Sequence, residues 1–450
     1  MRVLFATAEL RPLASAGGLG EAAAGLAAAL TEAGVDVITV IPGYSHYELD
    51  DEQQIPLDVP PFAAPASARL GDHAVAGRLA VIDVPGIVRP EPYVDGRGQG
   101  WPDNDRRFAS FAAAVASLAR TLAVDLVQLN DWHTALVPAF LGEGMPTVLT
   151  IHNLAHQGWC APGWIHELPS RRQAYVHRDA VNSLAGAIRL ADRVVTVSPN
   201  YAREITTARE GFGLEHDLAA RGRDLRGILT GIDARAWDPS TDAHAPHFSV
   251  TDMAGKQAAR AALLDRAGWA ATDDPLMVMV TRLVEQKGVD LAFEAARFLA
   301  GMKARLLVLG SGEPRLAEWG HWLGNTQPDR VWFYNGYDAP LSHELFAGGD
   351  LLLMPSRFEP CGLAQMQAMA YGTLPIVTPV GGLVDTVVDA DLHPNGTGFV
   401  AASVDESGIV DVVHRALRGV RHADRRKAMQ KRGMTTDWSW GEPAAEFVAL

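Results

Sequence analysis

The chain of 450 residues is long enough for two or three domains with large cores. Apolar residues make up 48% of it and charged residues 20%, which is typical of a globular protein rather than a disordered one. The formal net charge of −14 argues against a protein that binds nucleic acid or a membrane surface, because both partners demand extended basic faces.

The two cysteines, Cys160 and Cys361, lie far apart and in no metal-ligand spacing. They predict neither a disulfide framework nor a zinc site, and they fit a reducing compartment. The apolar run at the start is too short for a signal peptide, and no apolar run is long enough to span a bilayer. We therefore expect a cytoplasmic protein.

Short apolar strands alternate with amphipathic helices along the first half of the chain. Residues 20–33 form an Ala-rich helix pattern, which follows the first predicted strand. The predicted strands of this half are residues 2–7, 36–42, 125–129, 147–151 and 193–198. Such alternation is typical of parallel sheets that are covered by helices on both faces.

From residue 238 to 255 the pattern gives way to Pro, Asp, His, Ser and Thr, which is a linker composition. The alternation then resumes, with a helix predicted over 289–299 and a helical, charged stretch over 410–450. The predicted strands of this half are residues 276–280, 305–310, 331–334, 351–354 and 374–378.

The sequence therefore predicts an α/β protein of two doubly wound, Rossmann-like domains that face each other across a cleft. We expect a first domain over 1–238, a linker over 239–254, a second domain over 255–430, and a C-terminal helix over 431–450 that packs back toward the first domain. In such sheets ligands bind at the carboxyl ends of the strands.

Two glycine pairs stand at predicted strand-to-helix turns, Gly17-Gly18 in the first half and Gly381-Gly382 in the second. Without Cβ atoms the backbone can approach a ligand closely, and the N–H groups of a helix start favour phosphate. A tight turn alone would account for either pair, but the shared setting favours a role in binding.

Charged side chains follow two strands of the second half. Arg282 and Lys287 flank the turn after residues 276–280, and Glu359 lies in a stiff Phe-Glu-Pro turn after residues 351–354. Fixed cations can meet the charge that develops on a departing diphosphate. A carboxylate at this place can hold sugar hydroxyls or balance a cationic transition state, although it could also serve only as a helix cap.

Polar side chains also follow two strands of the first half. Asp131 and His133 come after residues 125–129, and His152-Asn153 comes directly after residues 147–151. Active-site groups collect at such strand ends, while each histidine taken alone is as well explained by a structural role.

Taken together, these segments resemble the family of bacterial glycogen synthases and plant starch synthases, glycosyltransferase family 5, over nearly the whole chain. The Arg-Phe-Glu-Pro-Cys-Gly run is the most specific of the shared motifs. The motifs lie in residues 17–19, 131–133, 152–158, 196–202, 282–288, 355–362, 371–373 and 381–386.

The resemblance implies a GT-B fold, a retaining reaction and no metal ion. It implies that Arg282 and Lys287 hold the donor diphosphate and that His152 and Glu359 serve the transferred ring. It implies a donor-binding set of Gly17, Gly18, Tyr337, Cys361, Gly362, Leu363, Gly381, Gly382 and Leu383. It implies an acceptor-side set of Ser15, Glu21, Asp131, His133, Asn153 and Thr230.

The chain departs from the family pattern in its first half. Ser15 stands where the family has a lysine, Thr230 where it has an asparagine, and Ala185 where it has a second lysine. Gln128-Leu129-Asn130-Asp131 replaces the usual His-x-His-Asp. The second half, which would hold the nucleotide, is nearly intact.

Three functions are open at this point. The first is transfer of a glucose-like group from a nucleoside diphosphate to a maltooligosaccharide or glucan. The second is a pseudo-glycosyltransferase that couples a nucleotide-activated, valienol-type cyclitol to an amino sugar, as in the biosynthesis of acarbose-type inhibitors. The third is a degenerate homologue that binds glucan or regulates a partner. The sequence leaves open the nucleotide base, the length of the acceptor and the oligomeric state.

Overall fold

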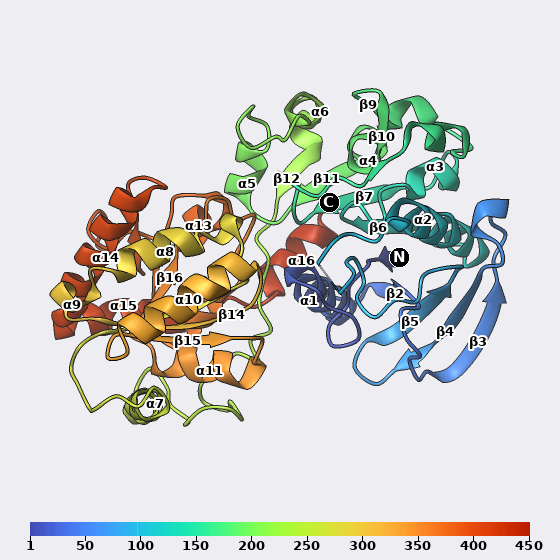
Figure 1. Ribbon diagram of the computed structural model, residues 1–450. Coiled ribbons are helices and arrows are strands. Elements are labelled where there is room, and N and C mark those ends of the chain that lie inside the picture. The colour runs from blue at the N-terminus through green and yellow to red at the C-terminus, as the bar shows by residue number, and fades with distance from the viewer. Residues whose placement is uncertain (97) are drawn as a thin grey trace. The chain divides into compact units, whose positions relative to one another are not determined.

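The computed structural model describes residues 1–96 and 98–450 and divides them into two compact units (Figure 1). Unit 1 comprises Met1–Gly231 together with Trp440–Leu450, and unit 2 comprises Ile232–Ser439. Both are mixed α/β structures built on largely parallel sheets, as the sequence predicts.

The main sheet in the described part of unit 1 has nine strands in the order β12-β11-β7-β6-β1-β2-β5-β4-β3. The strands from β12 to β5 pair in parallel, whereas β4 pairs antiparallel with both β5 and β3. The strands are β1 (Arg2–Ala6), β2 (Asp36–Pro42), β3 (Asp50–Pro56), β4 (Ser67–His73), β5 (Gly77–Asp83), β6 (Leu126–Asn130), β7 (Thr147–Ile151), β11 (Arg193–Thr196) and β12 (Leu225–Gly227).

A second, small sheet of unit 1 consists of β8 (Trp159–Cys160), β10 (Ala180–Asn182) and β9 (Val176–His177). The helices of unit 1 are α1 (Gly18–Glu32), α2 (Asn104–Thr121), α3 (Val137–Leu141), α4 (Ser183–Leu190), α5 (Pro199–Glu204), α6 (Glu215–Ala220) and α16 (Gly441–Val448).

Helix α1 owes its stability to alanine, the best helix former, and to burial of one face. The last helix of the chain covers that face: Trp440 and Ala444 share a buried cluster with Leu26 and Leu30. Figure 1 shows the red α16 beside the blue α1.

Gly25 lies in the middle of α1, where glycine is unfavourable, and the structure explains why it stands there. A Cβ atom at this position would overlap the indole ring of Trp440. Replacing Gly25 by alanine is therefore expected to destabilise the protein by about 1–3 kcal/mol, because overpacking outweighs a gain of about 1 kcal/mol in helix propensity.

Urea denaturation followed by circular dichroism measures this change. Gly301→Ala is the matched control, since Gly301 lies in a short helix of unit 2, Leu299–Met302, where an added Cβ atom would meet open space. A Gly25→Ala variant as stable as the wild type would contradict the packing explanation.

The sheet of unit 2 has six parallel strands in the order β15-β14-β13-β16-β17-β18. Its strands are β13 (Leu276–Val280), β14 (Arg305–Gly310), β15 (Val331–Asn335), β16 (Leu351–Met354), β17 (Leu374–Val377) and β18 (Phe399–Val400). Its helices are α7 (Ala254–Arg266), α8 (Val289–Ala296), α9 (Leu299–Met302), α10 (Pro314–Thr326), α11 (Ala339–Gly348), α12 (Ala364–Ala370), α13 (Gly381–Thr386), α14 (Glu406–Arg421) and α15 (Ala423–Thr435).

The central strands of unit 2 are continuous apolar runs, as expected for parallel strands that are buried on both faces. Met277, Met279, Leu306 and Val308 belong to one buried cluster that includes Phe293 of α8.

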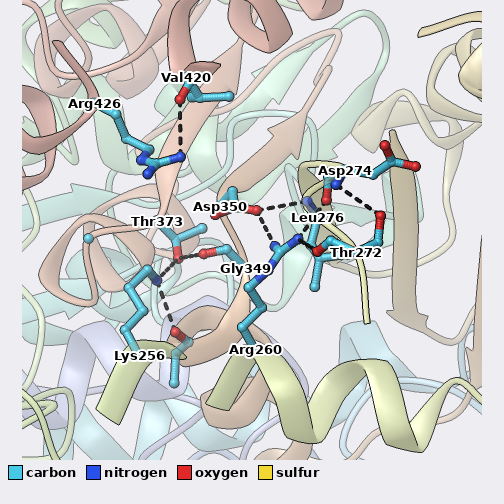
Figure 2. A network of polar contacts seen from close by, with 12 residues as sticks. Lys256, Arg260, Thr272, Asp274, Leu276, Gly349, Asp350, Thr373, Val420 and Arg426 are labelled. Atoms are coloured by element: carbon cyan, nitrogen blue, oxygen red, sulfur yellow. Dashed lines mark hydrogen bonds and ion pairs between the residues drawn. The ribbon is translucent and has the colours of Figure 1, made fainter. Parts of the chain in front are cut away.

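Two basic side chains one turn apart anchor helix α7 to the rest of unit 2 (Figure 2). The buried Lys256 ammonium lies 2.8–3.3 Å from four acceptors: the carbonyl oxygens of Phe346, Ala347 and Tyr371 and the hydroxyl of Thr373. Arg260 pairs with Asp350 and donates to the carbonyl oxygens of Thr272 and Asp274. Lys256 thereby satisfies carbonyl groups at the end of α11, which would otherwise be orphaned.

The segment whose composition predicts a linker packs within unit 2. The buried Asp242 carboxylate accepts hydrogen bonds from the Tyr371 hydroxyl at 2.6 Å and from His343 Nδ1 at 2.9 Å, and Phe248 is buried. The Trp237 ring stacks on His343, with ring centroids 3.9 Å apart. Asp242 of this segment is thus buried and paired rather than solvated, a distinction that composition does not reveal.

Candidate functional site

The order in which successive strands are added reverses within each main sheet, and several predicted site residues follow the strands that flank these switch points. In unit 2 the reversal lies between β13 and β16, and in unit 1 it lies between β1 and β6. Ligands of open parallel sheets bind beside such switch points, at the carboxyl ends of the strands. Each unit therefore has its own candidate site.

The switch point of unit 2 brings Lys287 and Glu359 together. Lys287 Nζ lies 2.6 Å from Glu359 Oε2, which also accepts a hydrogen bond from Ser356 Oγ at 3.0 Å. The side chains of Lys287 and Glu359 are only 18% and 6% exposed. The two residues are 72 positions apart in the chain, and their contact places an amine and a carboxylate together at the carboxyl ends of β13 and β16.

The loops after β13 and β16 hold this pair through backbone contacts. Arg357 N–H donates to the Gln286 carbonyl oxygen at 2.8 Å, and Gly288 has a φ of +62°. A Cβ atom at Gly288 would overlap the Pro355 carbonyl, so glycine is required there both for its conformation and for its close approach. The Arg357 guanidinium pairs with Asp290 at 2.6–2.7 Å and lowers the pKa of that carboxyl.

Two further predicted residues of unit 2 lie near the surface. Arg282 is exposed, and its side chain makes no hydrogen bond or ion pair with the part of the chain that the structure describes. Tyr337, just beyond β15, is 77% exposed. The Arg282 guanidinium and the Tyr337 ring are thus accessible at the end of the sheet where the loops with Lys287 and Glu359 also lie.

The second glycine pair has a packing role. Cβ atoms at Gly381 and Gly382 would overlap the carbonyl oxygens of Glu359 and Cys361. The Gly382 N–H donates to the Glu359 carbonyl oxygen at 3.1 Å, and Gly362, with a φ of +74°, directly precedes Leu363 at the start of α12. The pair lets α13 lie against the loop that carries Glu359.

The first glycine pair differs, because Cβ atoms at Gly17 and Gly18 would meet nothing within 4 Å. Neither residue has a positive φ. No contact with the described chain therefore demands glycine at these positions, and open space beside a helix start is what close approach of a ligand requires. Ser15 Oγ donates to the Gly17 carbonyl oxygen at 3.3 Å, and Glu21 lies in the first turn of α1.

Asp131 and His152 meet at the switch-point edge of unit 1. Asp131, with a φ of +55°, accepts the backbone N–H groups of His152 at 2.7 Å and Asn153 at 3.3 Å. The His152 ring bonds Asn130 Oδ1 at 2.9 Å. Burial lowers the pKa of His152 to about 4, so its imidazole is neutral near pH 7. Burial also raises the pKa of Asp131 to about 7.

The raised pKa of Asp131 predicts a pH-dependent contribution to stability. The folded protein holds this proton up to about pH 7, whereas the unfolded chain loses it near pH 4, so the contribution falls as the pH rises through this interval. Between pH 5 and 8, the unfolding free energy of wild type relative to Asp131→Asn is expected to fall by about 2–3 kcal/mol. Urea denaturation of both proteins measures it, and a constant difference would contradict the assignment.

His133 is buried and stacks on Tyr93, with ring centroids 4.6 Å apart. Burial lowers its pKa well below the usual value, and its Nδ1 atom has no hydrogen-bond partner in residues 1–96 and 98–450. Thr230 and His152 line one small cavity together with Trp440 and Phe447.

Two residues of this edge escaped the sequence analysis. Glu9 is 3% exposed and binds the glycine turn, and Tyr93 binds Glu9. A carboxylate two residues beyond a predicted buried strand was the available signal for Glu9, whereas Tyr93 lies in a loop without periodic pattern.

Within residues 1–96 and 98–450, no group of three or more His, Cys, Asp or Glu side chains could hold a metal ion. In the same residues no helix is both long and apolar enough to cross a membrane.

Two family models cover most of the chain. The model described as starch synthase catalytic domain matches residues 2–220, and the one described as glycosyl transferases group 1 matches residues 264–435. The chain is 37% identical to a glycogen synthase of Novosphingobium aromaticivorans over 474 residues, which cover 100% of this chain and 98% of that protein. It is 38% identical to a glycogen synthase of an Anaeromyxobacter species over 473 residues, again covering 100% and 98%.

A solved structure agrees with these relatives. The catalytic domain of starch synthase IV from Arabidopsis thaliana, bound to ADP and acarbose, superposes with a TM-score of 0.88 at 30% identity, covering 100% of this chain and 98% of that one.

Proposed function

The chain belongs to the family of glycogen synthases and starch synthases, and from that membership we propose that it elongates a glucan with glucose from ADP-glucose. It is a nucleotide-sugar-dependent glucosyltransferase of the GT-B fold. The choice of ADP rests on the ADP bound by the starch synthase, and the choice of a maltooligosaccharide-like acceptor rests on the names of the relatives. A cytoplasmic location stays a prediction.

The observation that carries the proposal is the Lys287–Glu359 pair at the switch point of unit 2, beside the exposed Arg282. We propose that Arg282 and Lys287 offset the negative charge on the departing diphosphate, a task that preorganised cations perform well in a site that excludes water. These side chains would take the place that a metal ion has in other transferases. Lys287 would then be shared between Glu359 and the phosphate oxygens.

Glu359 is proposed to accept hydrogen bonds from hydroxyl groups of the transferred ring and to balance positive charge on that ring. His152 would offer its neutral imidazole or its backbone to the same ring. In a retaining, front-face reaction the leaving phosphate takes the proton of the acceptor hydroxyl, so the step needs no nucleophile from the protein. The glycine turn at Gly17-Gly18 would bind the donor from unit 1.

The relatives are named glycogen synthases and a starch synthase, and neither the cyclitol-coupling nor the regulatory alternative is favoured. Incubation with maltooligosaccharide and ADP-, UDP-, GDP- or dTDP-glucose tests the proposal. We expect release of ADP and glucans of increasing length, in EDTA as well as without it. Failure to release a nucleoside diphosphate from any of the four donors would refute the proposal.

A further inference from the structure

Glu9 lies in the turn after β1, and its carboxylate organises the glycine turn of unit 1. Glu9 Oε2 accepts the backbone N–H groups of Ala16 at 2.7 Å and Gly17 at 3.0 Å. These are the last two residues before α1. A single buried oxygen thus fixes the peptide units that precede the start of this helix.

The second oxygen of the same carboxylate binds a distant loop. Glu9 Oε1 accepts the Tyr93 hydroxyl at 2.8 Å. No Lys, Arg or His side chain of residues 1–96 and 98–450 pairs with Glu9. Its buried carboxyl oxygens are instead satisfied by three hydrogen-bond donors, as the burial of a polar group requires.

Tyr93 is itself held in place. The Arg107 side chain is 1% exposed and donates to the carbonyl oxygens of Gly86, Ile87 and Pro92 at 2.9–3.0 Å. Asn104 Nδ2 donates to the Tyr93 carbonyl oxygen at 2.9 Å. The loop segment from Gly86 to Tyr93 is thereby fixed to α2, and the Tyr93 phenol is a firm anchor for Glu9.

The Tyr93 ring extends this connection to a third segment, because it stacks on His133 beyond β6. The Glu9–Tyr93 contact thus joins the turn after β1 to the turn after β6, and these are the two strands that flank the switch point of unit 1. Gly17 and Gly18, whose missing side chains leave open space, lie at the end of this chain of contacts.

We propose that Glu9 is a positioning residue for the nucleotide sugar: by linking Ala16 and Gly17 to Tyr93, it sets the place of the glycine turn that the donor approaches. Glu9 does not itself touch the donor. The inference rests on the proposed function, since it assigns a supporting residue to the same site.

Variants at both ends of the contact test the proposal. Glu9→Ala removes all three hydrogen bonds and is expected to raise the KM for ADP-glucose at least ten-fold, with kcat within three-fold and the acceptor KM unchanged. Glu9→Gln keeps an acceptor oxygen for the two N–H groups and is expected to stay within three-fold of wild type. Tyr93→Phe keeps the ring stacking but loses the bond to Glu9, and a three- to ten-fold rise in donor KM is expected.

The Glu9→Ala/Tyr93→Phe double variant is expected to match Glu9→Ala alone, because both changes break the same contact. Tyr371→Phe is the matched control: it also deletes a phenol that donates to a buried carboxylate, that of Asp242 in unit 2. It is expected to leave the donor KM within two-fold of wild type.

The outcomes distinguish a failure of the positioning role of Glu9 from a failure of the proposed function. If the wild type turns over ADP-glucose and Tyr93→Phe gives the kinetic constants of Tyr371→Phe, the positioning role of Glu9 is refuted and the proposed function stands. This comparison remains decisive if Glu9→Ala does not fold. If the wild type releases no nucleoside diphosphate from any donor, the proposed function fails and this inference fails with it.

Discussion

Lys287→Ala is expected to lower the turnover of nucleotide sugar about 100-fold or more, since losing one preorganised charge stabiliser typically has this effect. The variant removes the cation proposed to meet the leaving diphosphate. It also leaves the Glu359 carboxylate, 6% exposed, with the Ser356 hydroxyl in place of a full counterion. Initial rates of ADP release at saturating acceptor measure the loss.

Lys303→Ala is the matched control, because Lys303 is an exposed lysine of the same unit, at the end of α9. A thermal melt of both variants separates loss of chemistry from loss of folded protein. Equal rates for Lys287→Ala and Lys303→Ala would remove Lys287 from its proposed role. Ser356→Ala, which leaves the Lys287–Glu359 pair intact, is expected to have a much smaller effect.

Lys256→Met is expected to lower the unfolding free energy of the protein by about 3 kcal/mol, because several buried acceptors lose a charged donor and each unsatisfied acceptor costs about 1–3 kcal/mol. The methionine fills similar space but leaves the carbonyl oxygens of Phe346, Ala347 and Tyr371 without a charged donor. Urea denaturation at pH 6 measures the loss. This pH favours the ammonium form, because burial lowers the pKa of Lys256 to about 7.

Arg266→Met on the same helix is the control. Arg266 pairs with Glu344 at 2.6 Å, but its side chain is 43% exposed, and exposed pairs contribute at most about 1 kcal/mol. If both variants lose the same small amount of unfolding free energy, the buried Lys256 contacts stabilise the protein no more than an exposed ion pair does.

Most of the buried strands were predictable from the sequence because their residues are apolar on both faces, whereas β5, which is buried at its centre, was missed. The predicted ranges of β13 and β14 agree with Leu276–Val280 and Arg305–Gly310. The polar strand β3, Asp50–Pro56, was missed, because it is exposed and at the edge of its sheet, where pairing with β4 rather than its own composition defines it. The predicted helical stretch 410–450 is divided into parts of α14, then α15 and α16.

The candidate site was predictable only where its residues follow strands. Lys287 and Glu359 do so, and their placement predicted that they share an edge, although a sequence gives no distance between them. Glu9 bonds to backbone N–H groups, which every residue except proline carries, so its partners leave no pattern in the side chains. Asp242 was assigned to a linker because the amino-acid composition of a segment does not distinguish a buried, hydrogen-bonded aspartate from a solvated one.

Unit 1 is completed by the last residues of the chain, and this order has a consequence for biosynthesis. While the ribosome makes Ile232–Ser439, roughly 10–40 s at about 5–20 residues per second, the nascent α1 has no Trp440 to cover its apolar face. The first unit can therefore finish folding only after Trp440–Leu450 have been synthesised. Apolar surface that waits this long is a target for chaperones, so expression yield should depend on them more than the final stability suggests.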